Sequence, residues 1–472
     1  MSADIPNSSP NPPDDTEESL YQARKKIHPR SITGRFASWR LALVWFTQLI
    51  FYGLCWLPWN GRQAILFEVA ERKFYLFGLV LWPQDVFFLA ILLIISAYAL
   101  FLFTAVAGRL WCGYSCPQTV YTEIFLWIEK LIEGDRNARI KLDQESMSGS
   151  KLAKRTAKYG LWVLLSLWTG FTFVGYFTPI KSLVNELSTL SLGPWEWFWF
   201  LFYSAFTYLM AGHLREQVCL YMCPYARFQG VMFDPDTLVV TYDTERGEPR
   251  AARKKGEDYK TAGKGDCVDC GLCVAVCPTG IDIRDGLQYE CIGCSACIDA
   301  CDQVMDKMDY PRGLIRYSTE HAIAEHWGWK EILAHIVRPR IVLYSAILGI
   351  IVLAFAWGLA TKASLRVDII RDRAILAREV EGGLIENVFR LQVMNVSETA
   401  HRYSVSATGL DGIDIVGERI VELPAAGAKS MMVAVRVPPE SGKKGSNTIY
   451  FDVKSISDGN ISVHEKATFL LP

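Results

Sequence analysis

The sequence predicts an α-helical integral membrane protein with about five transmembrane helices, a cysteine-rich α+β insert and a C-terminal Ig-like β-sandwich. Three observations lead to this fold class. Of the 472 residues, 51% are hydrophobic, with 24 Phe and 15 Trp, which is more than a soluble protein usually carries. Eight of the 13 cysteines fall in two matching runs between residues 267 and 301. Residues 363–472 form short runs in which apolar and polar residues alternate.

Residues 1–40 are predicted to be a disordered, basic tail on the cytoplasmic side. The stretch SADIPNSSPNPPDDTEE is rich in Pro, Ser and acidic residues, so it cannot bury enough apolar surface to fold. Basic residues, among them Arg35 and Arg40, then precede the apolar run 41–57, and no small-residue cleavage site follows that run. The pattern predicts a retained membrane helix with its N-terminus inside, and not a cleaved signal peptide.

Four more apolar runs complete the membrane part: 86–106, 161–177, 197–211 and 341–360. Nine Lys and Arg residues lie between the second and third helices, in the loop 109–158, whereas only Lys181 lies between the third and fourth. The positive-inside rule therefore places this loop and residues 212–340 on the inner, cytoplasmic side of the membrane, and the segment from about Lys362 on the outer side. The expected division is a tail (1–40), four membrane helices (41–230), the cysteine-rich domain (231–340), a fifth helix (341–361) and the β domain (362–472).

Two further segments are predicted to form strands. Residues 60–84 are too broken by charge to span a membrane, so we expect short strands or an interfacial ribbon there. In residues 363–472, runs such as FRLQVMNV and KSMMVAVRV are separated by Gly, Pro and Asn at a spacing of roughly ten residues, which is typical of a β-sandwich. This segment contains no Cys, so its stability must come from its hydrophobic core.

Each cysteine run between residues 267 and 301 has the spacing Cys-x2-Cys-x2-Cys-x3-Cys. Such a run gives three thiolates to one iron-sulfur cube and the fourth to its neighbour, so the insert is predicted to be a bacterial-type 2[4Fe-4S] ferredoxin domain. Zinc is the alternative, but a tetrahedral zinc ion would leave the third cysteine of each run without a role. Thiolates kept for clusters need a reducing compartment, which agrees with the cytoplasmic placement. The expected ligands are Cys267, Cys270, Cys273 and Cys301 for one cluster, and Cys291, Cys294, Cys297 and Cys277 for the other.

A second set of cysteines forms an internal repeat, Cys112-Gly-Tyr-Ser-Cys116-Pro and Cys219-Leu-Tyr-Met-Cys223-Pro. Each pair follows the expected cytoplasmic end of a membrane helix, and the proline takes the second cysteine out of helical geometry. We therefore expect the four thiols to converge at the inner membrane surface. They suit a soft metal, Cu(I) before any other. A redox-active dithiol, or cysteines that serve only as small apolar residues at helix ends, are the alternatives.

Other candidates have simpler interpretations. His213 is interpreted as an interfacial histidine before a metal or proton ligand. Met210, Met222 and the isolated Cys55 are interpreted as packing residues. Arg109 and Arg215 are interpreted first as charges at the inner interface, and second as groups that tune a cluster or bind a quinone.

With these motifs the chain resembles the CcoG/FixG/RdxA family, membrane-bound polyferredoxin-like proteins associated with assembly of cbb3-type cytochrome c oxidase. The resemblance covers nearly the whole chain, and includes TYDTERGEPR before the insert, the segment GDCVDCGLCVAVCPTGIDIRDGLQYECIGCSACIDACD and the β-rich tail. It implies that Cu(II) is reduced to Cu(I) in the cytoplasm for the haem-copper centre of the oxidase. It also implies that the oxidase assembly machinery and copper chaperones are partners. By motif, Cys112, Cys116, Cys219 and Cys223 would handle copper and the other eight cysteines would hold two [4Fe-4S] clusters.

Two other functions stay open. The chain can be a quinol or ferredoxin electron-transfer subunit of a respiratory chain, or a non-catalytic scaffold whose outer β domain docks the oxidase. The net charge of −1 gives no reason to expect a nucleic-acid partner. The sequence contains no flavin fingerprint and names no electron donor, and a copper site can lie within one chain or across a homodimer.

Overall fold

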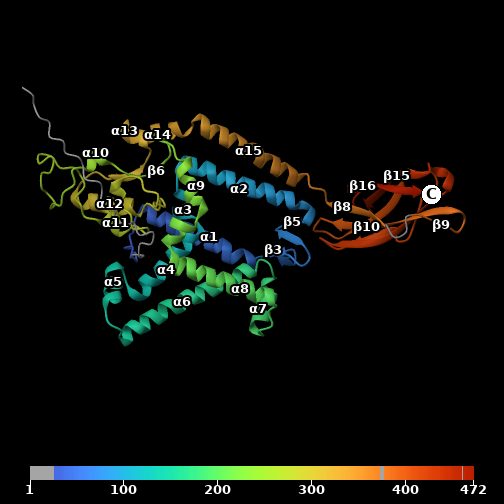
Figure 1. Ribbon diagram of the computed structural model, residues 1–472, viewed down its shortest axis with the longest axis horizontal. Coiled ribbons are helices and arrows are strands. Elements are labelled where there is room, and N and C mark those ends of the chain that lie inside the picture. Colours follow the sequence, from blue (N-terminus) through green and yellow to red (C-terminus); the bar gives the residue numbers. More distant parts are fainter. Residues whose placement is uncertain (1–25, 373–376, 460) are drawn as a thin grey trace, which may run out of the picture.

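The computed structural model describes residues 26–372, 377–459 and 461–472. The molecule is elongated, with long helices separating the cysteine-rich segment at one end from the C-terminal strands at the other (Figure 1). Of the predicted disordered tail, residues 1–25 lie outside the described residues. For residues 26–34 the prediction is wrong, because Lys26 pairs with Asp143 at 2.7 Å and the Arg30 amide donates to the Ala275 carbonyl at 2.8 Å. We call residues 26–34 the N-terminal strap.

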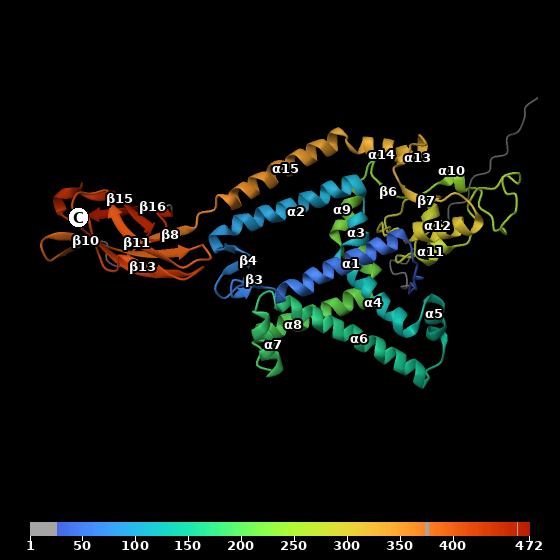
Figure 2. The same ribbon diagram turned by 180° about the vertical axis from the view of Figure 1, so that it is seen from behind.

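A long helix covers most of each of the five apolar runs. They are α1 (Arg35–Gly53), α2 (Val86–Ala107), α6 (Gly149–Val174), α8 (Pro194–Thr207) and α15 (Pro339–Ala360). Within the described residues, two stretches are long and apolar enough to span a membrane, Pro83–Ala107 and Pro339–Ala360, and this indicates a membrane protein. The two helices lie side by side in both views (Figures 1 and 2). The five-helix topology and its orientation stay a prediction.

Three of these helices differ from the predicted spans. Helix α1 begins at Arg35 and not at residue 41, so it carries Arg40 on its first turns. Helix α6 begins at Gly149, inside the basic loop, because the Ser148 side chain caps it by accepting the Lys151 amide at 3.2 Å. Helix α8 ends at Thr207 and continues as a π-helical turn, η3 (Tyr208–Leu214).

Shorter helices fill the segments that sequence patterns left as loops. Helix α4 is amphipathic and buries Phe125 and Ile128 while Trp127 and Leu131 stay exposed. The shorter helices are α3 (Leu110–Tyr114), α4 (Pro117–Glu133), α5 (Arg136–Gln144), α7 (Ile180–Ser188) and α9 (Pro224–Met232), with the π-helical turn η4 (Val218–Met222) and the 3-10 turns η1 (Leu54–Trp56) and η2 (Pro83–Asp85).

The cysteine-rich segment has a small core built from a two-stranded sheet and one longer helix. Strand β6 (Val239–Tyr242) pairs antiparallel with β7 (Ile315–Ser318), and both pack on α12 (Ala296–Met308). Its core includes Val240, Ile298, Met305, Leu314 and Ile315. Around this core lie α10 (Thr244–Gly247), α11 (Leu272–Ala275), η5 (Ile283–Asp285), α13 (Glu320–Ala324) and α14 (Trp329–Ile336).

Residues 58–81 form a strand ribbon, as predicted for the 60–84 segment. Strands β1 (Pro58–Trp59) and β2 (Arg62–Gln63) pair, and β3 (Ile65–Glu68), β4 (Lys73–Leu76) and β5 (Leu79–Leu81) form a second antiparallel sheet. One face of this ribbon shares a core with the C-terminal domain, because Tyr75, Val80 and Trp82 pack with Met394 and Val396.

The C-terminal domain is a sandwich of two antiparallel sheets, which confirms the prediction of an Ig-like β-sandwich. One sheet has the order β12-β14-β10-β8, with β9 beside β10, and the other β13-β11-β15-β16. Phe389, Phe451 and Phe469 are fully buried between them. The elements are β8 (Leu365–Arg371), β9 (Arg378–Val380), β10 (Leu384–Asn395), β11 (His401–Thr408), β12 (Asp414–Val416), β13 (Ile420–Leu423), β14 (Ala428–Val437), η6 (Pro439–Ser441), β15 (Gly445–Ser455) and β16 (Ser462–Leu471).

A buried carboxylate joins the start of α2 to the end of α15 and to the sandwich. Asp85 has a fully buried side chain and pairs with Lys362 at 2.8 Å and with Arg366 at 2.6 Å. The predicted topology puts Lys362 and Arg366 on the outer side, where the positive-inside rule expects few cations. Their pairing with Asp85 gives them a structural role at this junction.

Candidate functional site

The structure brings the four cysteines assigned to the first cluster around one cavity. Cys267, Cys270, Cys273 and Cys301 all line it, with apolar walls from Leu314 and other core residues. The loop reaches this geometry through Gly271, whose φ of 64° lies in the left-handed region that glycine adopts without strain.

The second quartet lines a neighbouring cavity. Cys277, Cys291, Cys294 and Cys297 surround it, and Cys273 borders both cavities, so the two lie side by side. Four thiols around an apolar cavity suit an iron-sulfur cube, which takes thiolate ligands. Among the described residues, no three His, Cys, Asp or Glu side chains are placed to hold a single metal ion. The thiols of a cube bind separate iron atoms and therefore stand farther apart than the ligands of one ion.

Burial shapes the acid-base behaviour of these thiols. It raises the pKa of Cys294 to about 12, although the nearby Arg40 cation lowers it in part. Burial also raises the pKa of Cys301 to about 12 and that of Cys273 to about 11. These thiols are therefore protonated at neutral pH in the absence of metal, and metal binding must release their protons.

The four cysteines of the CxxxCP repeat sit at two matching helix junctions. Cys112 lies in α3, and Cys116 is the N-cap of α4, whose first residue is Pro117. Cys219 lies in η4, and Cys223 is the N-cap of α9, which begins with Pro224. Proline thus places the second cysteine at a helix start, as the sequence predicted. Burial, and to a lesser extent the charges of the Cys116, Cys112 and Cys223 thiolates, raise the pKa of Cys219 to about 12.

These thiols adjoin the second cysteine quartet. Cys112 and Cys219 pack against an apolar group that includes Cys294 and Ile292. The backbone of α3 touches the cysteine loop at Gly113, where an added Cβ would lie 2.8 Å from both the Cα and the amide nitrogen of Cys294. Only glycine allows this approach.

Two arginines hold the second cysteine loop by its carbonyl groups. Arg109 donates to the carbonyls of Tyr289 and Cys291, the latter at 3.3 Å. Arg40 Nη1 donates to the Cys294 carbonyl at 2.9 Å and Nη2 lies 3.6 Å from Glu123. Sequence reasoning missed Arg40, because nothing in the basic run around it distinguishes it from its neighbours.

Gln229 is a second residue that sequence reasoning missed. Its side chain is fully buried, and Nε2 donates to the Cys112 sulfur at 3.3 Å. Within the described part of the chain, its Oε1 has no hydrogen-bond partner. The amide therefore offers one unused acceptor beside the thiols.

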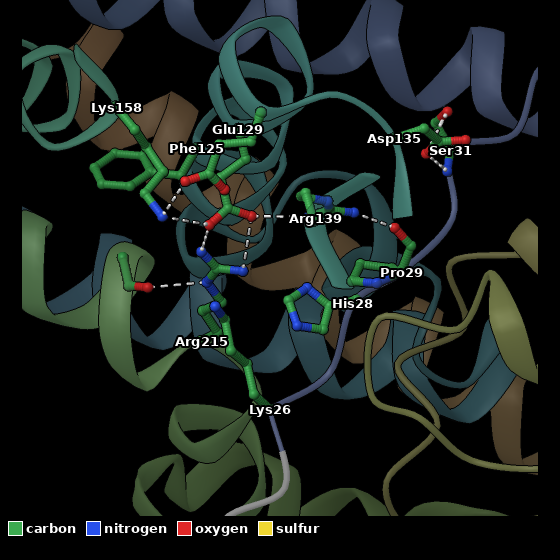
Figure 3. A network of polar contacts seen from close by, with 12 residues as sticks. Lys26, His28, Pro29, Ser31, Phe125, Glu129, Asp135, Arg139, Lys158 and Arg215 are labelled. Carbon is green, nitrogen blue, oxygen red and sulfur yellow. Dashed lines mark hydrogen bonds and ion pairs between the residues drawn. The ribbon is translucent and has the colours of Figure 1, made fainter. Parts of the chain in front are cut away.

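Arg215 belongs to a buried ion-pair network rather than to the thiols. Figure 3 shows Arg215, Arg139 and Lys158 converging on Glu129. Arg215 Nη2 lies 2.7 Å and Arg139 Nη1 2.8 Å from Glu129 carboxylate oxygens. Arg139 also donates to the Pro29 carbonyl of the strap, at 2.5 Å. The network thus joins α4, α5, α6, η3 and the strap.

The remaining candidates differ in their packing. His213 lies among the rings of Tyr159, Trp162 and Tyr208. Met210 is half-buried, whereas Met222 is 53% exposed, so its interpretation as a packing residue is wrong. Cys55 is fully buried in a separate apolar cluster with Phe171 and Leu183, which agrees with its interpretation as a packing residue.

Comparison with known proteins identifies the relatives of this chain. A 4Fe-4S dicluster domain model matches residues 214–320, a 4Fe-4S binding domain model residues 89–134, and a model for the IG-like fold at the C-terminal of FixG residues 355–472. Protein RdxB of Cereibacter sphaeroides is 40% identical, over 84% of this chain and 84% of its own. Protein RdxA of the same organism is 37% identical, over 93% of this chain and 94% of RdxA. The nitrogen fixation protein FixG of Rhizobium meliloti is 38% identical, over 83% of this chain and 80% of FixG.

The chain belongs to the FixG/RdxA/RdxB family. This FixG/RdxA protein is therefore an iron-sulfur redox protein with an Ig-like C-terminal domain. The two 4Fe-4S matches contain all twelve cysteines of the three quartets, because residues 89–134 include Cys112 and Cys116, and residues 214–320 include the other ten.

Proposed function

We propose that this FixG/RdxA protein is a membrane-bound iron-sulfur oxidoreductase that reduces Cu(II) to Cu(I) for assembly of cbb3-type cytochrome c oxidase. One observation carries the proposal, namely that Cys112 and Cys219 pack against the buried apolar group that includes Cys294 of the second cysteine quartet. Thiolates select Cu(I) over harder ions, so a set of four thiols is suited to receive the product of the reduction.

The three quartets have separate roles in this proposal. Cys267, Cys270, Cys273 and Cys301 hold one cluster, and Cys277, Cys291, Cys294 and Cys297 hold the other. When bound, a [4Fe-4S] cluster supplies one-electron transfer at a potential that its surroundings set. The substrate Cu(II) gains one electron and becomes Cu(I), so one electron passes per ion. Cys112, Cys116, Cys219 and Cys223 would supply the thiolates for copper in this step, with a pair of them for each ion, because no three of them are placed in the described structure to hold one ion.

The residues around the CxxxCP thiols hold these thiols and the second cysteine loop in place. Gly113 lets α3 lie against the Cys294 backbone, which keeps the path between them short. Arg40 and Arg109 tie the carbonyls of Cys294 and Cys291 to α1 and to the start of α3. Gln229 donates to Cys112 and thereby favours its thiolate form, the form that binds metal.

The proposal includes the multi-pass topology, with the clusters in the cytoplasm and the β-sandwich in the periplasm of a bacterial inner membrane. Copper chaperones would then meet the thiols from inside, and the oxidase assembly machinery the sandwich from outside. A reporter enzyme that is active only in the periplasm, fused after Pro472, should be active, and the same reporter fused after Gly256 should be silent. The reverse result would contradict this topology.

The reductase activity is tested with purified protein whose clusters are reduced by dithionite without oxygen. After removal of excess dithionite, added Cu(II) should appear as a Cu(I) chelate while the cluster absorbance returns. Changing Cys112, Cys116, Cys219 and Cys223 together to Ser should abolish this reaction. Cys55→Ala, which removes a buried thiol outside the three quartets, should leave it unchanged. Equal rates in wild type and the quadruple variant would contradict the proposal.

A second candidate function is an electron-transfer subunit of a respiratory chain. The match of a 4Fe-4S binding domain to residues 89–134 favours it, because the cysteines in that range are Cys112 and Cys116. The four CxxxCP thiols would then hold a third iron-sulfur centre and not copper. Iron analysis separates the two functions, since the quadruple Ser variant should keep all of its iron if the thiols serve copper and lose a third of it if they hold a cluster.

The scaffold function and the reductase function predict opposite results for cluster-ligand variants in cells. It requires cluster-ligand variants such as Cys294→Ser to support oxidase maturation, and a truncation after Thr361 to abolish it. The reductase proposal requires the Cys294→Ser variant to fail.

A further inference from the structure

A cavity of about 320 Å³ lies between the N-terminal strap, the first turns of α1, helix α4 and the second cysteine loop. Its lining includes Cys294 from the second cluster quartet and Cys219 from the CxxxCP thiols. The proposed clusters do not fill it, because the four cysteines of each cluster surround a different cavity. Its volume lies at the lower end of the range typical of small-molecule sites, about 300–1,000 Å³.

The inner wall of this cavity is polar and close to the redox groups. Arg40 lies between the Cys294 carbonyl, to which it donates at 2.9 Å, and Glu123, whose carboxylate is 3.6 Å away. Gln118 and Thr122 of α4 also line the wall. A ligand with ring hydroxyl or carbonyl groups could therefore meet a carboxylate and hydroxyls on the side that faces Cys294.

The outer rim is apolar and exposed. Leu41 of α1 and Trp127 of α4 both line the cavity and are 55% and 59% exposed. Around them Trp39, Trp45 and Leu131 are exposed as well. Exposed tryptophans on the helices of a membrane protein are typical of the boundary between lipid and water. The mouth of the cavity is therefore accessible to a molecule dissolved in the bilayer.

We propose that this cavity binds a lipid-soluble quinol, which donates the electrons that the protein uses. The polar wall suits the ring oxygens of a quinol and the rim suits its apolar tail. The inference rests on the proposed function in one respect, that electrons leave through the clusters.

The electron and proton balance is simple. One quinol becomes one quinone and releases two electrons and two protons. Each of the two clusters accepts one electron, so no further oxidant is needed until copper arrives. Glu123 is the proton acceptor in this scheme, because its carboxylate lines the cavity and its side chain is 39% exposed, which gives the proton a way out to water.

Binding is tested with decylubiquinone on purified protein in detergent, by the quenching of tryptophan fluorescence. We expect saturable binding to the wild type. Ala37→Phe, which fills the cavity from α1, should weaken it about tenfold or more. Ala42→Phe places the same ring on the same helix at an exposed position outside the lining, and should bind as the wild type does. Thr122→Phe fills the cavity from α4 and repeats the test should Ala37→Phe fail to fold. Absence of saturable binding, or equal affinity in the filled and control variants, would overturn the proposal.

Electron transfer is tested by adding decylubiquinol without oxygen and following the bleaching of the clusters. In Glu123→Gln the clusters should be reduced by the quinol about tenfold more slowly than in wild type, and by dithionite at the normal rate. If the quinol bleached the clusters of wild type and of Glu123→Gln at the same rate, Glu123 would have no role in this step.

Reduction of the clusters by dithionite in place of quinol also separates this proposal from the proposed function. Ala37→Phe charged with dithionite should still reduce Cu(II), because the quinol is bypassed. If quinol reduces the clusters but dithionite-charged wild type leaves Cu(II) unchanged, the copper function fails and the quinol site stands.

Discussion

Gly113 is the residue on which the approach between the CxxxCP thiols and the second cysteine loop depends. It lies between Cys112 and Cys116, and its Cα faces the Cys294 backbone so closely that a methyl group there would overlap main-chain atoms. Main-chain atoms cannot turn aside as a flexible side chain can. A larger residue must therefore move the whole of α3.

We predict that Gly113→Ala uncouples the thiols from the second cluster. Overpacking at such a site costs about 1–3 kcal/mol, and a shift of α3 should slow copper reduction by dithionite-charged protein while the iron content stays normal. Gly149→Ala is the matched control, because a Cβ there meets nothing within 4 Å. Copper reduction at the wild-type rate in Gly113→Ala would show that the close approach is not needed.

At the residue scale, cysteine spacing carried most of the predictive information. The ligand partition between two cavities follows from local spacing, because three thiols within seven residues can reach one cube. Arg40 and Gln229 could not be found in this way. Their partners, the Cys294 carbonyl and the Cys112 sulfur, lie 254 and 117 positions away, and contacts over such distances leave no pattern in a single sequence.

At the scale of elements, the network around Glu129 locks four helical segments and the strap together. Glu129 is 2% exposed and is surrounded by Arg139, Arg215 and Lys158. Burial alone would raise the pKa of Glu129, but the Arg215 cation and its neighbours outweigh this effect and hold the pKa below its usual range. The carboxylate is therefore charged at neutral pH and neutralises part of a buried cationic group.

We predict that Glu129→Gln destabilises the helical part by about 3–5 kcal/mol, because it leaves buried cations without their partner. The unfolding temperature of purified protein, followed by circular dichroism, should fall clearly. Glu418→Gln breaks an exposed pair with Lys429 by the same change and should have little effect.

The network also predicts the effect of acid. Since the pKa of Glu129 is lowered on folding, its stabilisation is complete above the pH at which a free glutamate titrates, and is lost as the pH falls through the lower pKa of the folded state. The difference in the free energy of unfolding between wild type and Glu129→Gln should therefore become smaller as the pH falls. A difference that is the same at all pH values would contradict this assignment.

Sequence patterns predicted the long helices better than the helices around the site. Apolar runs mark α2 and α15 clearly, whereas α4 and α5 were left within a basic loop, because a short amphipathic helix with many charges gives a weak signal. The start of α1 was also misplaced. The charges of Arg35 and Arg40 indicated a tail. The Cys294 carbonyl, to which Arg40 donates, lies far along the sequence and could not be foreseen.

At the scale of the whole molecule, the sandwich is joined to the helices by the strand ribbon and by Asp85. The ribbon residues Tyr75, Val80 and Trp82 share a core with Met394 and Val396, and Arg62 pairs with Glu398. The C-terminal domain is thus held at two points besides its covalent link. Its position relative to the helices could not be predicted, since the strand pattern of each segment reveals its own fold but not the face that it uses for docking.

We predict that Asp85→Asn loosens this junction. It leaves Lys362 and Arg366 without their buried carboxylate, which should cost about 3–5 kcal/mol at the interface. Trypsin should then cleave faster after these two residues and release the sandwich intact. In Asp414→Asn, which breaks an exposed pair with Arg419 inside the sandwich, cleavage at this point should match that of the wild type. Unchanged cleavage in Asp85→Asn would show that the ribbon alone holds the junction.

The N-terminal strap has a consequence for the order in which this chain is built. Asp299 accepts the amides of Phe36 and Ala37 at the start of α1, and Ala275 accepts that of Arg30. These acceptors leave the ribosome more than two hundred residues after the strap itself. The strap is therefore synthesised early but is among the last segments to settle, and a ribosome-bound chain that stops before the cysteine runs should expose its strap to protease.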